Sequence, residues 1–224
     1  VRVSVTRDDP SRLAEAAAIC ELDGGAGLIV ATNAPPADWT HETGCVLVGA
    51  AHPSIPAITH ESLDALAIAV GHLRDQGHEH ILFLDAGLRS DFRHVDAFCQ
   101  LSRDEGFVGH IERTGGGANT LGTITTAVSS GPVTAVLVSD DGIATDLVGH
   151  LRDKGLRVPE DVSVCGYNHD PEHVDPLTSV DQRVPDLVAA AHQMLHGWGA
   201  SATCSEPSMV ELGMTVSSPP PRRK

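Results

Sequence analysis

Two short stretches of this sequence bring together side chains that could bind a metal ion or transfer a proton. In the first, His169 and His173 stand beside Asp170 and Glu172, and imidazole and carboxylate groups are common zinc ligands. Pro171 lies between the two histidines and breaks any helix that would align them. We therefore interpret this stretch as a solvated loop and predict no metal site.

The second stretch is the adjacent pair Asp140–Asp141, which could act as an acid/base pair. Adjacent side chains usually diverge, and one of these carboxylates is well placed to cap a helix that begins near Gly142. The residues leave ligand contact and capping equally open for Asp140, and they favour capping for Asp141. The motifs G-x-S-x-G, G-x-x-x-x-G-K-[ST] and H-E-x-x-H do not occur, so we predict no catalytic residues, no cofactor and no enzyme activity.

The overall composition narrows the class of protein. The 224 residues are 41% hydrophobic, which is enough to bury one large core or two smaller ones. A formal net charge of −15 repels the DNA backbone, so we do not expect these residues to bind DNA directly. The chain shows neither a run of roughly 18 apolar residues nor a secretory signal at its start, which predicts a cytoplasmic protein without membrane contact. The five cysteines are scattered without a C-x-x-C pair, which is typical of reduced core residues.

Short β-branched runs alternate with amphipathic stretches, a pattern typical of βαβ units. The sequence therefore predicts an α/β protein with mainly parallel sheets. The predicted strands are Val1–Thr6, Gly27–Thr32, Cys45–Gly49, His80–Leu84, Thr134–Ser139 and Asp161–Tyr167. The predicted helices run from Asp9 to Leu22, from Ser62 to Gly77, from Asp141 to Gly155 and onward from Pro185.

A polar stretch contains three consecutive glycines, Gly115–Gly117. In our prediction it lies between two helical segments with no strand directly before it, whereas a phosphate-binding loop follows a strand. We interpret it as a mobile loop.

Four ordered motifs carry a resemblance to a known family. They are residues 69–73 (AVGHL) with Gly77-His78 and 81–84 (ILFL), residues 134–141 (TAVLVSDD) with 155–159 (GLRVP), residues 161–167 (DVSVCGY), and residues 176–182 (PLTSVDQ). In this order and spacing, the chain from about His60 onward resembles the effector domain of LacI/GalR (lactose/galactose repressor) transcriptional regulators.

The resemblance implies two Rossmann-like lobes, arranged as the clamshell of periplasmic binding proteins. The first lobe would comprise residues 1–78 and 182–210, and the second residues 79–181 and 211–224. Residues 1–32 best resemble the family's second strand, second helix and third strand, so one βα unit of the first lobe is missing. Either Val1–Thr6 takes the central place of the first strand or the central strand is absent. The first option leaves fewer unpaired backbone groups and is favoured.

The resemblance also implies an effector site in the cleft between the lobes. The predicted effector-binding residues are Asp64, Arg93, His94, Asp140, Asn168 and Gln182. His94 stands where the family commonly has an arginine, and Arg89 and Arg93 are close enough in sequence to replace it. Sugar sites use carboxylates, amides and a planar bidentate donor. Family frequency favours a sugar, and a nucleoside or another small polar metabolite is also compatible.

By this resemblance, the chain is the ligand-sensing core of a homodimeric transcriptional regulator. A bound metabolite would change the affinity for operator DNA, which contacts an N-terminal head absent from these residues. The alternative is an extracytoplasmic solute-binding protein of a transporter, which shares the two-lobe fold. A third interpretation is an interaction protein that keeps the dimer surface without sensing a ligand.

Overall fold

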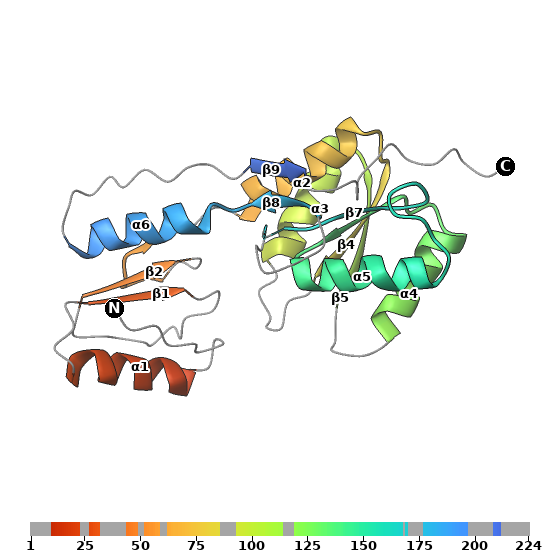
Figure 1. The fold of residues 1–224 in the computed structure, drawn as a ribbon. Helices are drawn as coiled ribbons and strands as arrows, with labels where there is room; N and C mark the ends of the chain where they lie inside the picture. The colour runs from red at the N-terminus through yellow and green to blue at the C-terminus, as the bar shows by residue number, and fades with distance from the viewer. Residues whose placement is uncertain are drawn as a thin grey trace. The chain divides into compact units, whose positions relative to one another are not determined.

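The computed structural model describes residues 10–22, 27–31, 44–48, 52–58, 62–85, 93–113, 119–167, 169, 177–196 and 208–211. The chain divides into two units: unit 1 comprises Val1–His60 and Arg183–Glu206, and unit 2 comprises Glu61–Gln182 and Pro207–Lys224. The chain therefore passes from one unit to the other three times. Both units contain helices and parallel strands (Figure 1), which confirms the predicted α/β class.

Unit 1 contains a three-stranded parallel sheet. Its strands, in spatial order, are β1 (Leu28–Ala31), β2 (Cys45–Val48) and β3 (Ala57–Ile58). All four residues of β2 are buried, as expected for a central strand with apolar cover on both faces. On one face, Val46 and Val48 pack against Leu187 and Ala191 of α6 (Val184–Leu195). Helix α1 (Pro10–Leu22) belongs to the same unit.

Unit 2 is built around a four-stranded parallel sheet with the spatial order β5-β4-β6-β7. The strands are β4 (His80–Asp85), β5 (Val108–Arg113), β6 (Ala135–Val138) and β7 (Ser163–Cys165). Every residue of β6 and β7 is buried, whereas β5, at the edge, has only exposed and half-buried residues. The sheet therefore has a well-covered centre and one solvated edge strand.

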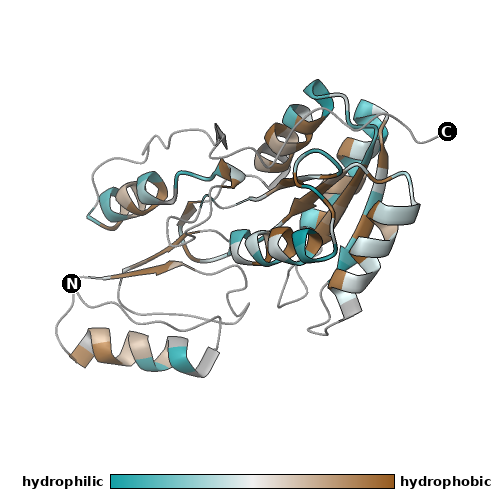
Figure 2. Cartoon of the chain, turned by 45° about the vertical axis from the view of Figure 1, so that its right-hand side comes forward, coloured by the Kyte–Doolittle hydropathy of each residue, from teal (hydrophilic) through white to brown (hydrophobic). Residues whose placement is uncertain are grey.

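Helices cover both faces of this sheet (Figure 1). Helices α2 (Ser62–Asp75) and α3 (Arg93–Glu105) contribute to the core on one face, and α4 (Asn119–Ser130) and α5 (Asp141–Asp153) to the core on the other. Because side chains alternate along a strand, Ile81 and Phe83 of β4 enter the first core, while Leu82 and Leu84 enter the second. Figure 2 shows the central strands as hydrophobic along their length, between helices that carry both hydrophobic and hydrophilic residues.

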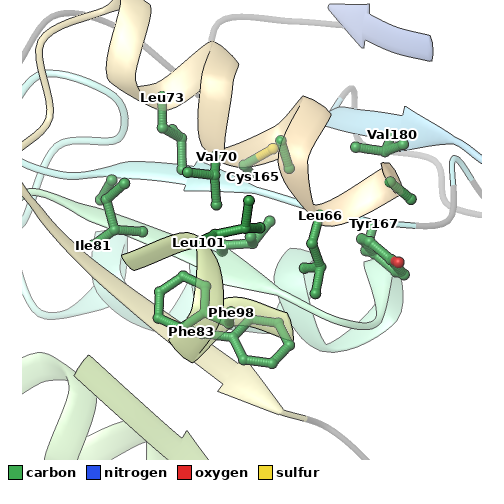
Figure 3. Close-up of a cluster of buried hydrophobic side chains, with 14 of the residues drawn as sticks. Leu66, Val70, Leu73, Ile81, Phe83, Phe98, Leu101, Cys165, Tyr167 and Val180 are labelled. Carbon is green, nitrogen blue, oxygen red and sulfur yellow. The ribbon is translucent and has the colours of Figure 1, made fainter. Parts of the chain in front are cut away.

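The first core joins α2 firmly to unit 2 (Figure 3). Leu66, Val70 and Leu73 of α2 are wholly buried in the same cluster as Phe83 and Phe98, whose rings stack with centroids 5.2 Å apart. Our predicted lobe boundary at residue 78 assigns this helix to the first lobe. In the structure, the boundary between the units precedes the helix, because its apolar face belongs to the core of unit 2.

The segment that carries the fourth motif forms a separate strand pair in unit 2. Strand β8 (Thr178–Asp181) pairs antiparallel with β9 (Ser208–Glu211). The backbone of Gly166, just after β7, donates a hydrogen bond to the carbonyl of Thr178 over 2.8 Å. This bond places the start of β8 beside the end of β7.

Most of the predicted elements are present. Strands occur in five of the six predicted ranges. The sixth range, Val1–Thr6, lies outside the described residues, and the missing βα unit therefore stays a prediction. Gly77 and Gly155 follow α2 and α5 with φ of 98° and 80°, the left-handed conformation that ends helices and favours glycine. Among the described helices, none is both long and apolar enough to cross a membrane.

One part of the interpretation of Gly115–Gly117 is wrong. A strand, β5, does precede the glycines and ends at Arg113, and α4 begins at Asn119. The sequence conceals this strand because it lies at the sheet edge, where Val108 and Ile111 remain 48% and 39% exposed. The glycines themselves lie outside the described residues.

Candidate functional site

Polar side chains follow the carboxyl ends of the strands in unit 2. Because all four strands are parallel, their carboxyl ends meet at one edge of the sheet, which is where open α/β folds bind ligands. In strand order, the polar residues at this edge are Arg113, Asp85, Asp140 with Asp141, and Tyr167. We refer to these five residues as the carboxyl-edge row.

Asp85 and Arg113 form an ion pair at the end of β4 and β5. They are register partners, and Arg113 Nε donates a hydrogen bond to Asp85 Oδ2 over 3.0 Å. The Asp85 side chain is only 2% exposed, whereas that of Arg113 is 39% exposed. The buried carboxylate therefore anchors a partly solvated guanidinium. Our sequence analysis missed both residues, although an aspartate closing the apolar run ILFL is a signal that could have identified the site.

Asp140 caps helix α5. Its backbone is extended, with φ −146° and ψ 128°, and its Oδ1 accepts a hydrogen bond from the backbone N–H of Ile143 over 2.9 Å. This is the usual arrangement of a helix N-cap, which satisfies one of the unpaired N–H groups of the first turn. Of the two roles that the sequence left open for Asp140, the structure shows the cap.

Asp141 has a different role from the one we favoured. Its side chain is 3% exposed, and Oδ1 accepts hydrogen bonds from Tyr167 N–H and from the Ser179 hydroxyl, each over 2.8 Å. The prediction that Asp141 caps a helix is therefore wrong. Asp140 already occupies the cap position. Asp141 lies in the first turn of the helix, and its carboxylate reaches Tyr167, just after β7, and Ser179, near the start of β8.

The backbone at Gly166, directly after β7, lies close against this carboxylate. A Cβ atom on Gly166 would overlap Asp141 Oδ1 and would lie 2.6 Å from Leu177 Cδ2 and 3.0 Å from Ser179 Oγ. Ser179 Oγ also accepts a hydrogen bond from the backbone of His169 over 3.0 Å. Only glycine fits at position 166, which explains why glycine precedes Tyr167 here.

Tyr167 brings together two of the predicted site residues. Gln182 Nε2 donates a hydrogen bond to the Tyr167 carbonyl over 3.0 Å, and the ring of His94 meets the Tyr167 ring edge-on with centroids 5.3 Å apart. Tyr167 is 3% exposed, and burial raises the pKa of its phenol above the usual value. The phenol is therefore protonated at neutral pH and can serve as a hydrogen-bond donor.

The other predicted site residues are only partly placed. Asp64 and Arg93 lie in the first turns of α2 and α3, but their side chains, like the whole of Asn168, lie outside the described residues. His173 is also outside them. Among the described residues, there is no group of three or more His, Cys, Asp or Glu side chains that could hold a metal ion. The site is thus a row of hydrogen-bonding groups at the sheet edge.

A parallel sheet covered on both faces, with buried and half-buried polar groups along its carboxyl edge, defines a ligand-binding α/β domain. Residues 70–202 match the family model of the periplasmic binding protein-like domain. This match covers more than half of the chain, and the chain belongs to that family.

Individual relatives agree with this assignment. An HTH-type transcriptional regulator of Lachnoclostridium phytofermentans is 30% identical over 151 residues, which cover 61% of this chain and 44% of the relative. The chain thus spans less than half the length of that protein. A LacI family regulator from Lactobacillus casei with bound glucose is 21% identical with a TM-score of 0.72, over 96% of this chain and 87% of that one. A dimeric Lac repressor is 22% identical with a TM-score of 0.75, over 98% and 88%. The predicted resemblance to LacI/GalR regulators is confirmed.

Proposed function

We propose that this chain is the effector-binding part of a LacI-type transcriptional regulator. It binds a small polar metabolite and thereby controls DNA binding by a segment outside these 224 residues. The carboxyl-edge row of unit 2 is the observation that carries this proposal. Family membership and the helix-turn-helix relative support it.

The chemistry of the row suits a sugar or a nucleoside-like compound. Asp140 Oδ1 accepts the capping hydrogen bond from the backbone N–H of Ile143, and the carboxylate has further acceptor positions for ligand hydroxyls. The guanidinium of Arg113, held by Asp85, supplies a planar donor two strands away, roughly 10 Å from Asp140 by the usual strand spacing. This span fits a monosaccharide or a nucleoside. The L. casei relative, which contains glucose, supports the same class of ligand.

We assign ligand contacts to the six predicted residues, and we propose Arg113 as a seventh because its guanidinium lies at the same sheet edge. Three of the six, His94, Asp140 and Gln182, have described side chains at or beside the carboxyl edge. His94 and Gln182 both contact Tyr167, so they could position a ligand relative to that ring. Asp64, Arg93 and Asn168 are proposed on the family resemblance alone.

Isothermal titration with a panel of sugars and nucleosides tests the proposal. We expect one compound to bind, and Asp140→Asn to weaken it about tenfold or more, because an amide keeps the cap but removes the charged acceptor. Asp153→Asn, at the exposed end of the same helix, is the matched control and should bind normally. The absence of heat with every compound would count against an effector site.

The alternative function, an extracytoplasmic solute-binding protein, shares the fold. The regulator relative favours the transcriptional role over it. The genomic sequence upstream of Val1 separates the two: a helix-turn-helix supports the regulator, and a secretory signal supports the transporter component. With the regulator we also propose a cytoplasmic location and a homodimer, for which the dimeric Lac repressor is the structural support.

A further inference from the structure

The charges of the carboxyl-edge row restrict which small polar metabolite it can bind. The row contains three aspartates, Asp85, Asp140 and Asp141, and one arginine, Arg113, so negative charge is in excess. A ligand site discriminates by the charges that it places against the wrong ligand as well as by its favourable contacts. The distribution of these charges therefore indicates the charge of the effector.

The charge of Arg113 is already balanced within the protein. Its Nε donates a hydrogen bond over 3.0 Å to Asp85 Oδ2, and the Asp85 side chain is only 2% exposed. An anion bound to the remaining N–H groups of Arg113 would lie close to this buried carboxylate, and like charges at close range repel each other strongly where water is excluded. Arg113 therefore suits a ligand hydroxyl better than a phosphate group.

The first turn of α5 is occupied by the protein's own carboxylates. A helix that follows a strand at the carboxyl edge of a parallel sheet can hold a phosphate, because free N–H groups and the positive end of the helix dipole face it. In this chain α5 follows β6, and Asp140 Oδ1 accepts the N–H of Ile143 over 2.9 Å. Asp141 adds a second carboxylate in the same turn. These carboxylates compensate the dipole and repel a phosphate from the helix end.

The two carboxylates of α5 differ in what they leave for a ligand. Asp141 is 3% exposed, and its Oδ1 is held by the N–H of Tyr167 and the hydroxyl of Ser179, which are uncharged donors and leave its negative charge in place. Asp140 is half-buried and has acceptor positions beyond the capping hydrogen bond. A ligand ammonium group at Asp140 would gain a charge-assisted hydrogen bond and the attraction of the neighbouring Asp141.

We propose, on the basis of the proposed function of this row, that the effector is a sugar or nucleoside that carries a basic amine, and that phosphorylated metabolites are excluded. The ammonium group binds Asp140, and a ligand hydroxyl accepts a hydrogen bond from Arg113. The excess negative charge of the row then stabilises the bound cation, and the same charge repels a phosphate.

Sets of three ligands in which one carbon carries a hydroxyl, an amine or a phosphate test this preference. Suitable sets are glucose, 6-amino-6-deoxyglucose and glucose 6-phosphate, the matching galactose compounds, and adenosine, 5′-amino-5′-deoxyadenosine and adenosine 5′-monophosphate. Isothermal titration at about pH 7 keeps the amines protonated. In the set that binds, we expect the amine to bind about tenfold or more tighter than the hydroxyl, and the phosphate to bind weakest.

The outcomes separate this preference from the proposed function. If the phosphate binds tightest, or if the amine binds no better than the hydroxyl, the proposal is overturned while an effector site is still present. If no compound of any set binds, the proposed function itself is contradicted, and the amine preference fails with it. These titrations use the unsubstituted chain and do not depend on the folding of any variant.

Asp140→Asn separates the effect of charge from that of shape. The amide keeps the cap and the size of the side chain, so the variant should bind the amine and the hydroxyl compound within about threefold of each other. Asp153→Asn removes a negative charge from the exposed end of the same helix and should keep the full preference. An amine preference that persists in Asp140→Asn would overturn the contact between the ammonium group and Asp140.

Discussion

The Ser179 hydroxyl donates a hydrogen bond to Asp141 Oδ1 over 2.8 Å, although the two residues are 38 positions apart in the chain. The same oxygen accepts the backbone N–H of Tyr167, and Ser179 Oγ accepts that of His169. One buried carboxylate therefore holds the start of α5, the end of β7 and β8 in a single arrangement. This arrangement places Tyr167 where His94 can contact it.

Removal of this carboxylate should destabilise the fold. In Asp141→Ala, the N–H of Tyr167 and the hydroxyl of Ser179 lose their acceptor in a buried place, which should lower the free energy of unfolding by about 2–4 kcal/mol. Urea denaturation followed by circular dichroism measures the loss. Asp146→Ala, on the exposed side of α5, is the control and should change stability by less than about 0.5 kcal/mol. Equal losses in the two variants would refute the buried role of Asp141.

A methyl group at position 166 should be poorly tolerated. Gly166→Ala pushes Cβ against Asp141, Leu177 and Ser179, and we expect a loss of about 2–3 kcal/mol in unfolding free energy. Gly149→Ala is a matched change in α5, where a Cβ meets nothing within 4 Å. It should raise stability by about 0.5–1 kcal/mol, because alanine favours a helix more than glycine does. A neutral Gly166→Ala in the same denaturation assay would show that the close approach is absent.

Alkaline pH should weaken unit 1 through Cys45. Burial, with a smaller contribution from Cys20, raises the pKa of the Cys45 thiol from 9.0 to about 11. The folded state therefore keeps this proton longer than the unfolded state, so the stabilisation is complete below pH 9 and is lost as the pH rises to about 11. Burial raises the pKa of Cys165 and Tyr167 in the same direction. The difference between the original chain and Cys45→Ala, measured by urea denaturation across this range, isolates Cys45 and should shrink with pH.

Acidic pH should lower the stability of unit 2 through His110 of β5, whose ring lies against that of His80 of β4. Burial and His80 lower the pKa of His110 from 6.5, so the unfolded state takes up its proton first. The stability that His110 contributes is complete above pH 6.5 and is lost as the pH falls through the lower value of the folded state. The unfolding free energy of the original chain should fall more steeply below pH 6.5 than that of His110→Asn. Parallel pH profiles for the two proteins would contradict this assignment.

Much of unit 2 is predictable because its signals are local. The apolar runs of β4 and β6 indicate buried strands, and Gly77 and Gly155 mark helix ends through their tolerance of positive φ. Of the six predicted site residues, His94, Asp140 and Gln182 occupy or adjoin the carboxyl edge. The ligand contacts of all six remain predictions.

The sequence by itself determined that this is an α/β chain of the LacI/GalR type, because periodic hydrophobicity and four ordered motifs are properties of neighbouring residues. Only the tertiary structure decided that Asp140 caps α5 while Asp141 receives Tyr167 and Ser179, and that Arg113 pairs with Asp85. It also decided that Val108–Arg113 is a strand. The physical reason is the same in each case. The partners of a carboxylate or of an edge strand come from distant parts of the chain, and no local pattern specifies which distant group will be adjacent after folding.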